Sequence, residues 1–316
     1  MKTRKLGKTG FDVSEIGMGC WQLGGDFGPI EDATSQAALI AAHEAGITFY
    51  DTADVYGGGR SELQVGHFLK GPGAGSVVAT KVGRTAELYP NRYNRGAIYD
   101  HLKASASRLG VGRLDLVQLH CVPPGVLEDG AIFNIMDEMV DEGLTAHWGA
   151  SVETLAEARV CLAQPGCASL QIIFNLYRQN AVWEIFDEAK EKNVGIIVRL
   201  PLASGMLTGK FSKGQRFAET DHRNFNADGA AFSVGETFSG IELNKGIDAL
   251  ELIKPLVPAG MTLADFALRW ILDHDAVSSV IAGVSRPEQA VRNAAASDLA
   301  PLGPDVHAEL RRIYEA

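Results

Sequence analysis

Four side chains with complementary proton chemistry follow short apolar stretches of the sequence: Asp51, Tyr56, Lys81 and His120. A tyrosine hydroxyl can protonate a carbonyl oxygen when its pKa, ordinarily about 10, is lowered toward neutrality. The Lys81 ammonium would favour the tyrosinate, and Asp51 would keep that ammonium in place and charged. His120 would donate a hydrogen bond to the substrate oxygen and stabilise the charge that develops there. These residue types together predict proton transfer to a carbonyl group.

The same four residues also admit other interpretations. Asp51 and Lys81 could brace the rim of a barrel, with Tyr56 a loop aromatic and His120 a buried core histidine. An aldolase would use Lys81 as a Schiff-base amine, but that role needs a lowered lysine pKa, whereas a nearby Asp51 raises it. A metal hydrolase is disfavoured because none of the eight histidines forms an HxH or HxxxH pair. The joint placement of all four residues favours carbonyl chemistry.

Repeated strand and helix pairs must position these residues. Short apolar runs alternate with amphipathic stretches over nearly the whole chain, a pattern typical of βα units around a parallel sheet. The predicted strands cover residues 16–20, 47–50, 76–80, 114–119, 146–150, 169–173, 194–198 and 277–282. Eight such units close most economically into an α/β fold of the (β/α)8 TIM barrel type. Asp51, Lys81 and His120 then follow the second, third and fourth strands, at the end where barrel enzymes carry their active sites.

The remaining segments are predicted as caps and loops of one domain, residues 1–316, because no change in composition marks a linker. Residues 2–14 predict a β-hairpin that plugs the other end of the barrel. Residues 203–243 are rich in Gly and Ser and lack periodicity, which predicts a long functional loop after strand seven. Thr262 is predicted to cap a helix, and Ser285 with Glu288 to form a capping box around the last barrel helix.

Composition narrows the classes of partner. The net charge of −10 argues against a protein whose main function is nucleic-acid binding, since such binding neutralises phosphates with Lys and Arg. The N-terminus has no apolar stretch of signal-peptide length, and no segment approaches the roughly 20 apolar residues of a membrane span. The cysteines lack CxxC and metal-ligand spacing, which favours reduced thiols: Cys20, Cys121, Cys161 and Cys167. We therefore expect a cytoplasmic protein with no metal, membrane or nucleic-acid partner.

Several dispersed motifs agree in order and spacing with a known family. The runs are FYDTADVYGGGRSE, ATKVG, LVQLH, WGAS, PLASGMLTGKF and IAGVSRPEQAVRN. They span nearly the entire chain, which on these motifs resembles the aldo-keto reductase superfamily. The resemblance implies the barrel, a nicotinamide cofactor across the strand ends, and hydride transfer between NADP(H) and an aldehyde, ketone or alcohol. It also implies catalytic roles for Asp51, Tyr56, Lys81 and His120.

The resemblance implies a set of cofactor-binding positions as well. Cys20 and Trp21 match the segment beside the nicotinamide, and Ser151 and Gln171 match the residues that hydrogen-bond its carboxamide. The positions that match the pyrophosphate cradle are Pro201, Leu202, Ala203, Ser204, Gly205 and Lys210. The positions that match the adenosine and 2′-phosphate pocket are Gly283, Ser285, Arg286, Gln289 and Asn293.

Charge and geometry support an anion site in the last of these segments. Ser285 and Arg286 precede a predicted helix, where free N–H groups and the helix dipole favour an anion. The Arg286 guanidinium adds a fixed positive fork. We therefore expect NADP(H) to be preferred over NAD(H), and Arg223 in the long loop to fold over the phosphates.

Two positions depart from the commoner family pattern. Val152 follows Ser151 where many members have asparagine, so one carboxamide contact would be absent or supplied by backbone. Arg199 ends strand seven where many members stack an aromatic ring on the nicotinamide, although some branches carry arginine there. Its guanidinium plane could stack instead.

A non-catalytic role is the main alternative. The potassium-channel β subunits, NADP(H)-sensing proteins, share this barrel and resemble the chain in its PLASG and GxSxxxQ segments. They typically lack the histidine that this chain has as His120, which favours catalysis. The expected partner is a small carbonyl or alcohol substrate, with Trp21 and Phe27 as candidate pocket residues. The sequence leaves the substrate and the oligomeric state open.

Overall fold

The computed structural model describes residues 1–219, 221–226, 228–230 and 233–315, and its centre is a closed barrel of parallel strands. The strands are β3 (Ile16–Gly19), β4 (Phe49–Asp51), β5 (Val77–Val82), β6 (Leu114–His120), β7 (Thr145–Ser151), β8 (Cys167–Ile173), β9 (Gly195–Arg199) and β10 (Val277–Gly283). Neighbours in the barrel are neighbours in the sequence, except where β10 pairs with β3 and closes the ring. The predicted barrel is confirmed, and each predicted strand overlaps an observed one.

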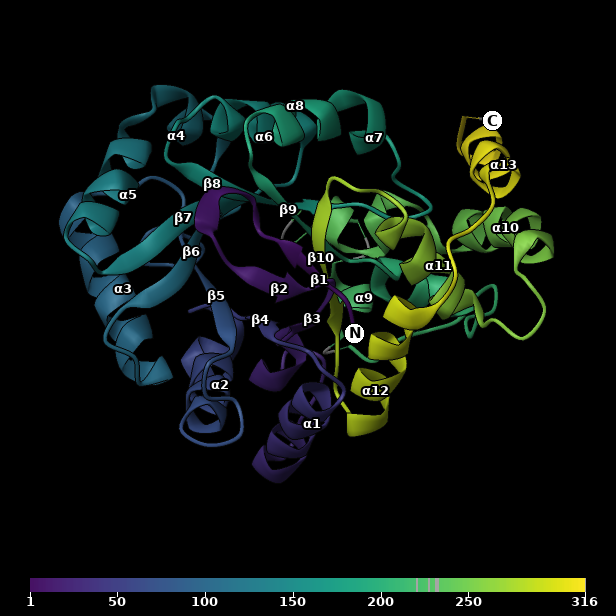
Figure 1. Ribbon diagram of the computed structural model, residues 1–316, viewed down its shortest axis with the longest axis horizontal. Helices are drawn as coiled ribbons and strands as arrows, with labels where there is room; N and C mark the ends of the chain where they lie inside the picture. The colour runs from purple at the N-terminus through teal and green to yellow at the C-terminus, as the bar shows by residue number, and fades with distance from the viewer. Residues whose placement is uncertain (220, 227, 231–232, 316) are drawn as a thin grey trace.

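Helices surround the strands, as Figure 1 shows in a view along the barrel. They are α1 (Asp32–Glu44), α2 (Arg60–Leu69), α3 (Arg95–Leu109), α4 (Pro124–Asp129), α5 (Ala131–Asp141), α6 (Leu155–Leu162), α7 (Ala181–Glu184), α8 (Phe186–Glu191), α9 (His222–Phe225), α10 (Leu243–Ile253), α11 (Leu263–Leu272), α12 (Pro287–Ala295) and α13 (Pro304–Glu315). The predicted Thr262 cap is confirmed: its hydroxyl accepts from the Asp265 N–H at the start of α11. Among the described residues, no helix is long and apolar enough to cross a membrane.

Short 3-10 helices fill several connections. They are η1 (Gly7–Thr9), η2 (Trp21–Gly24), η3 (Tyr56–Gly59), η4 (Ala203–Thr208), η5 (Val234–Glu236), η6 (Phe238–Gly240), η7 (Lys254–Leu256) and η8 (Ala296–Asp298). Five of them, η2 to η6, follow strand ends or belong to the long loop after β9, so they border the C-terminal end of the barrel.

The cap of α12 differs from the prediction of a Ser285–Glu288 box. Arg286 is the N-cap residue, and the Gln289 side-chain oxygen accepts from the backbone N–H groups of Ser285 at 2.8 Å and Arg286 at 3.0 Å. Because Pro287 takes the first helical position, Gln289 stands at the third, from which a side chain reaches back to the cap. Glu288 is exposed at the second position.

The predicted N-terminal hairpin is confirmed. Its strands β1 (Thr3–Lys5) and β2 (Asp12–Ser14) pair antiparallel and lie across the barrel end that faces the viewer in Figure 1. Leu6 and Val13 from the hairpin are fully buried in one cluster with Phe49, Leu116 and Ile197 of the barrel. This apolar plug closes the N-terminal end, which leaves the C-terminal end for polar groups.

The segment between β9 and α10 is an irregular excursion over the C-terminal end, and residues 220, 227 and 231–232 within it lie outside the described part of the chain. Its two ends are held together because the Ser204 hydroxyl donates to the Glu236 carbonyl and accepts from the Phe238 N–H, both at 3.2 Å. Ser204, Phe238 and Ser239 have φ angles of 54°, 50° and 60°, a region that costs non-glycine residues roughly 1–3 kcal/mol each.

Candidate active site

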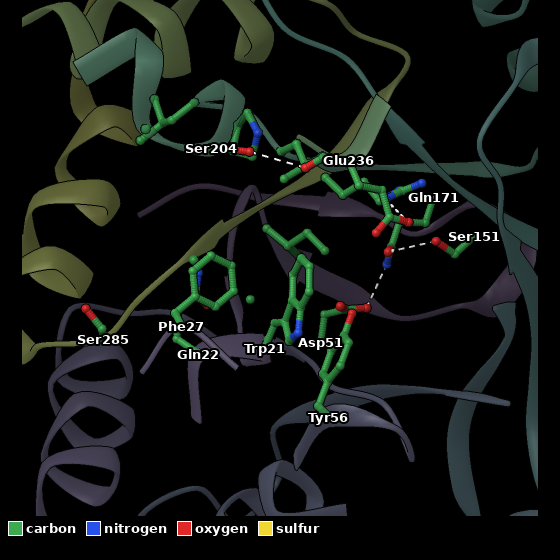
Figure 2. Close-up of a pocket in the computed structure, with 18 of the residues that line it drawn as sticks. Trp21, Gln22, Phe27, Asp51, Tyr56, Ser151, Gln171, Ser204, Glu236 and Ser285 are labelled. Carbon is green, nitrogen blue, oxygen red and sulfur yellow. Dashed lines mark hydrogen bonds and ion pairs between the residues drawn. The ribbon is translucent and has the colours of Figure 1, made fainter. Parts of the chain in front are cut away.

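A cavity of about 400 Å³ opens at the C-terminal end of the barrel. Figure 2 shows Trp21, Asp51 and Tyr56 on one side of it, with Ser204 and Glu236 across from them. It is lined by Gly19, Trp21, Gln22, Phe27, Asp51, Tyr56, Arg84, His120, Ser151, Gln171, Arg199, Leu200, Pro201, Leu202, Ser204, Gly205, Thr208, Arg223, Glu236, Ile281, Gly283, Ser285 and Gln289.

Lys81 lies beneath the cavity and connects two of its lining residues. Its ammonium donates to the Asp51 carboxylate at 2.5 Å, to the Thr52 carbonyl at 2.8 Å and to the Tyr56 hydroxyl at 3.2 Å. Burial lowers the pKa of Lys81, but Asp51 and Tyr56 more than offset it, so the lysine pKa is raised. Lys81 therefore stays charged, which argues against a Schiff-base role.

Amide side chains hold the second Asp51 oxygen. Gln118 on β6 and Gln171 on β8 donate to it at 3.0 and 2.7 Å. The Ser151 hydroxyl on β7 donates to the Gln171 amide oxygen at 3.1 Å (Figure 2). Because these groups come from successive strands and are buried, the Asp51 carboxylate has one orientation, and it fixes Lys81 in turn.

Close contact between two loops aims Tyr56 at the cavity. Gly57 has a φ of 58°, and a Cβ on it would lie 2.2 Å from the Gly24 carbonyl oxygen, so only glycine lets η3 approach η2 this closely. The approach stacks the Tyr56 ring against Trp21, with centroids 5.7 Å apart and planes 19° apart. The hydroxyl end of Tyr56 is thereby held next to Lys81.

The net pKa shift of Tyr56 is opposite to the sequence prediction. Burial raises its pKa to about 12, although Lys81 lowers it as expected. Asp51 also contributes a raising effect. The phenol is therefore a proton donor that stays protonated at neutral pH, and Lys81 makes the tyrosinate less costly than burial alone would.

His120 ends β6 beside this tyrosine. The two rings meet edge to face, with centroids 5.7 Å apart. Burial, together with the positive charges of Arg84 and Lys81, lowers the pKa of His120 well below its ordinary value. The imidazole is thus neutral at physiological pH, and in that form it donates one hydrogen bond to a ligand and accepts one. Its Nδ1 is buried without a hydrogen-bond partner among the described residues.

Most of the other predicted site residues line the cavity, and some do not. Cys20 and Ala203 are buried behind its wall, and Asn293 is buried on α12. Lys210 and Arg286 are exposed beyond its rim. The predicted residues that do line it beside the catalytic candidates are Trp21, Phe27, Ser151, Gln171, Arg199, Pro201, Leu202, Ser204, Gly205, Arg223, Gly283, Ser285 and Gln289.

Arg223 reaches the cavity from the excursion. Its guanidinium lies 4.6 Å from the ring centre of Phe217, pairs with Asp221 at 2.5 Å, and donates to the Ser204 carbonyl at 3.4 Å. A cationic group thus stands beside the predicted pyrophosphate cradle.

The two departures from the family pattern contact each other. Arg199 donates through Nη2 to the Val152 carbonyl at 3.0 Å. The backbone of Val152 therefore orients the guanidinium that replaces the usual aromatic ring. The Arg199 Nε is buried with no hydrogen-bond partner among the described residues.

Two charged residues of the cavity, Arg84 and Glu236, are not among the residues predicted from the sequence. Arg84 donates to a Glu236 oxygen at 2.8 Å, and Arg199 forms an ion pair with the same oxygen at 3.1 Å. Arg84 stands two residues past β5, so the strand-end rule could have found it. Glu236 lies in the excursion, where no sequence pattern indicates the path of the chain.

Comparison with known proteins identifies the family. A model described as the Aldo/keto reductase family matches residues 15–315. The chain belongs to this family. Aldo-keto reductase YhdN of Bacillus subtilis (strain 168) is 28% identical over 92% of this chain and 86% of its own. A probable voltage-gated potassium channel subunit beta of Oryza sativa subsp. japonica is 30% identical over 100% of this chain and 97% of its own.

Solved aldo-keto reductases share the fold over nearly the whole chain. The holo form of AKR11C1 from Bacillus halodurans superposes with a TM-score of 0.79 at 26% identity, covering 99% of this chain and 96% of the other. The glycerol dehydrogenase AKR11B4 from Gluconobacter oxydans has a TM-score of 0.81 at 24% identity over 99% of this chain and 94% of its own, a likeness of fold alone.

Proposed function

We propose that this aldo/keto reductase family member is an NADPH-dependent oxidoreductase that transfers hydride reversibly between NADP(H) and an aldehyde, ketone or corresponding alcohol. One observation carries the proposal: the Lys81 ammonium joins Asp51 at 2.5 Å and the cavity-lining Tyr56 hydroxyl at 3.2 Å. A phenol held by a charged ammonium at the surface of a pocket is a general acid for a carbonyl oxygen.

Each catalytic candidate has a separate task. Tyr56 gives its proton to the carbonyl oxygen during reduction and takes it back during oxidation. Lys81 stabilises the tyrosinate left behind, and Asp51 holds Lys81. Neutral His120 donates a hydrogen bond that orients the same oxygen and stabilises its developing charge.

The residues along the cavity fit a dinucleotide, which when bound supplies the hydride. The cavity continues from Tyr56 to Gly283, Ser285 and Gln289 at the start of α12. A Cβ on Gly283 would lie 2.2 Å from the Gln22 amide, and the Gln22 oxygen is buried without a hydrogen-bond partner among the described residues. A narrow passage with an unsatisfied polar atom suits a polar ligand. The holo form of the related AKR11C1 is consistent with this.

In the proposed complex, Ser151 and Gln171 face the nicotinamide and Arg199 packs beside it. The segment 201–205, with Arg223, surrounds the pyrophosphate. Ser285, Arg286 and Gln289 receive the adenosine and its 2′-phosphate at the α12 N-terminus, where the helix dipole favours an anion. The cation at Arg286 is the basis for preferring NADP(H) over NAD(H).

A non-catalytic, NADP(H)-sensing role is the second candidate. It is favoured by the likeness to the probable channel β subunit of Oryza sativa and to one from Arabidopsis thaliana, which is 28% identical over 96% of this chain. The placement of His120 beside Tyr56 favours catalysis instead, because a sensing protein needs no hydrogen-bond donor at the reacting oxygen.

Replacing Tyr56 by Phe tests the proposal. The variant should lose about 10²- to 10⁴-fold in NADPH-dependent turnover of an aldehyde panel, the usual contribution of a general acid. NADPH affinity, followed by fluorescence titration, should be unchanged because the ring remains. Undiminished turnover would contradict the role of Tyr56. A wild-type protein that binds NADPH and turns over none of the panel would support the sensing role.

A further inference from the structure

An acidic side chain from the excursion is buried between two arginines at the mouth of the barrel. The Glu236 side chain is 3% exposed, and its Oε1 accepts from Arg84 and forms an ion pair with Arg199. Arg84 follows β5 and Arg199 ends β9, and these strands are four places apart in a ring of eight. Glu236 therefore connects opposite sides of the barrel across the cavity.

The backbone of Glu236 is fixed from the other end of the excursion. Its carbonyl accepts from the Ser204 hydroxyl (Figure 2). That hydroxyl also accepts from the Phe238 N–H. Strained φ angles on Ser204, Phe238 and Ser239 persist only where surrounding contacts impose them. The ion pairs of Glu236 are such contacts.

The neighbours of Glu236 make its charge matter to the reaction. Arg84, Arg199 and the Cys121 thiol contact its Oε1, and Glu153 has a carboxylate oxygen within 4.8 Å of a Glu236 oxygen. The arginines hold the pKa of Glu236 below its ordinary value against burial, so it is ionised at neutral pH. Burial and the Glu236 charge raise the pKa of Glu153. Two guanidinium groups already neutralise the Glu236 carboxylate, so the cluster of Cys121, Glu153 and Glu236 does not favour a metal ion.

Both reacting side chains respond to these charges. Arg84 and Arg199 help to lower the pKa of His120, after burial, and Glu236 contributes to the raised pKa of Tyr56. The negative charge of Glu236 thus offsets the positive charges of Arg84 and Arg199, which would otherwise favour the tyrosinate form of a nearby proton donor.

We propose that Glu236 is a positioning residue of the reaction, which holds the Arg84 and Arg199 guanidinium groups beside Tyr56 and His120 and fastens the excursion over the cofactor cavity. The inference rests on the proposed function. Glu236 fixes the positions of the Arg84 and Arg199 guanidinium groups. The three charges together influence how readily the proton donor releases its proton.

Glu236→Gln removes the charge and keeps the shape. Its NADPH affinity should fall about tenfold, because the ion pair that holds Arg199 is lost. The midpoint at which alcohol oxidation by NADP⁺ rises with pH should move down by about half to one unit, since a negative charge near Tyr56 is lost. Glu219→Gln, which removes a charge from an exposed position of the same excursion, is the matched control and should change neither value.

Glu236→Ala gives a second, independent readout. This variant should lose turnover, and because acetate supplies the carboxylate that the substitution removes, it should restore several-fold of that loss, whereas chloride at equal ionic strength should not. An unchanged pH midpoint in Glu236→Gln together with no acetate effect in Glu236→Ala would overturn the proposal. If the wild type proves inactive, the proposed function fails, and NADPH titration alone decides: equal affinities of wild type and Glu236→Gln would overturn the role of Glu236 as well.

Discussion

Replacing Lys81 by Met would leave the Asp51 carboxylate buried without its cation. The two side chains are 0% and 3% exposed, so water cannot substitute for the lost partner. Breaking a buried pair by removing one member costs about 3–5 kcal/mol. Gln118 and Gln171 still donate to Asp51, which places the expected loss in free energy of unfolding near the lower limit, about 3 kcal/mol.

The same substitution removes the 3.2 Å contact from Lys81 to the Tyr56 hydroxyl. A charged hydrogen bond contributes about 1.5–3 kcal/mol, so reductase turnover should fall about 10- to 150-fold. Urea denaturation and NADPH oxidation measure the two effects separately. Adding Asp51→Asn removes the stranded charge and should regain about 1–2 kcal/mol of stability, but no turnover.

Two outcomes would refute this reasoning. Wild-type stability in Lys81→Met would mean that the buried charge pair contributes nothing. Recovered turnover in the Lys81→Met/Asp51→Asn double variant would mean that the ammonium does not act on Tyr56, because that variant still lacks it.

Two further predictions concern the cofactor and the fold. Arg286→Ala should weaken NADPH binding by about 1.5 kcal/mol, the lower value for a charged hydrogen bond because Arg286 is exposed, with little effect on NADH; equal losses for both would contradict 2′-phosphate recognition. Asp273 accepts from Arg269, His307 and the Leu302 N–H, so Asp273→Asn should cost about 2 kcal/mol at pH 7. Although burial opposes them, these partners lower the Asp273 pKa, so its stabilisation is present above about pH 4 and is lost as the pH falls below that value; a pH-independent difference in urea midpoints would contradict it.

The fold was predictable because the strands of a parallel barrel are buried on both faces and read as short apolar runs. The run 114–119, for example, coincides with β6 at Leu114–His120. The sequence prediction of a Ser285 cap for α12 is wrong because Pro287, after Arg286, starts the helix one residue later.

From residue types and spacing alone, the candidate site was predictable only where a residue stands next to a strand, whereas Arg223 and Gln289 were expected because of the family resemblance. Asp51, Lys81 and His120 are placed by β4, β5 and β6 themselves. Glu236 is placed by the folded path of the excursion, which no periodicity encodes. The direction of the Tyr56 pKa shift also escaped prediction, because the sequence shows its charged neighbours and not how much water its ring loses.

The pairing of β10 with β3 has a consequence for synthesis of the chain. Besides the strand pairing, the Val280 N–H donates to the Glu15 carbonyl and the Ser279 hydroxyl to the Ser14 carbonyl. The first and last strands of the barrel therefore each supply the hydrogen-bonding edge that the other needs. A ribosome adding roughly 5–20 residues per second needs about 13–55 seconds to travel from one strand to the other. Throughout that interval the nascent polypeptide has an unpaired β3 edge, a template for pairing with other chains that persists until the final eighth of the sequence emerges.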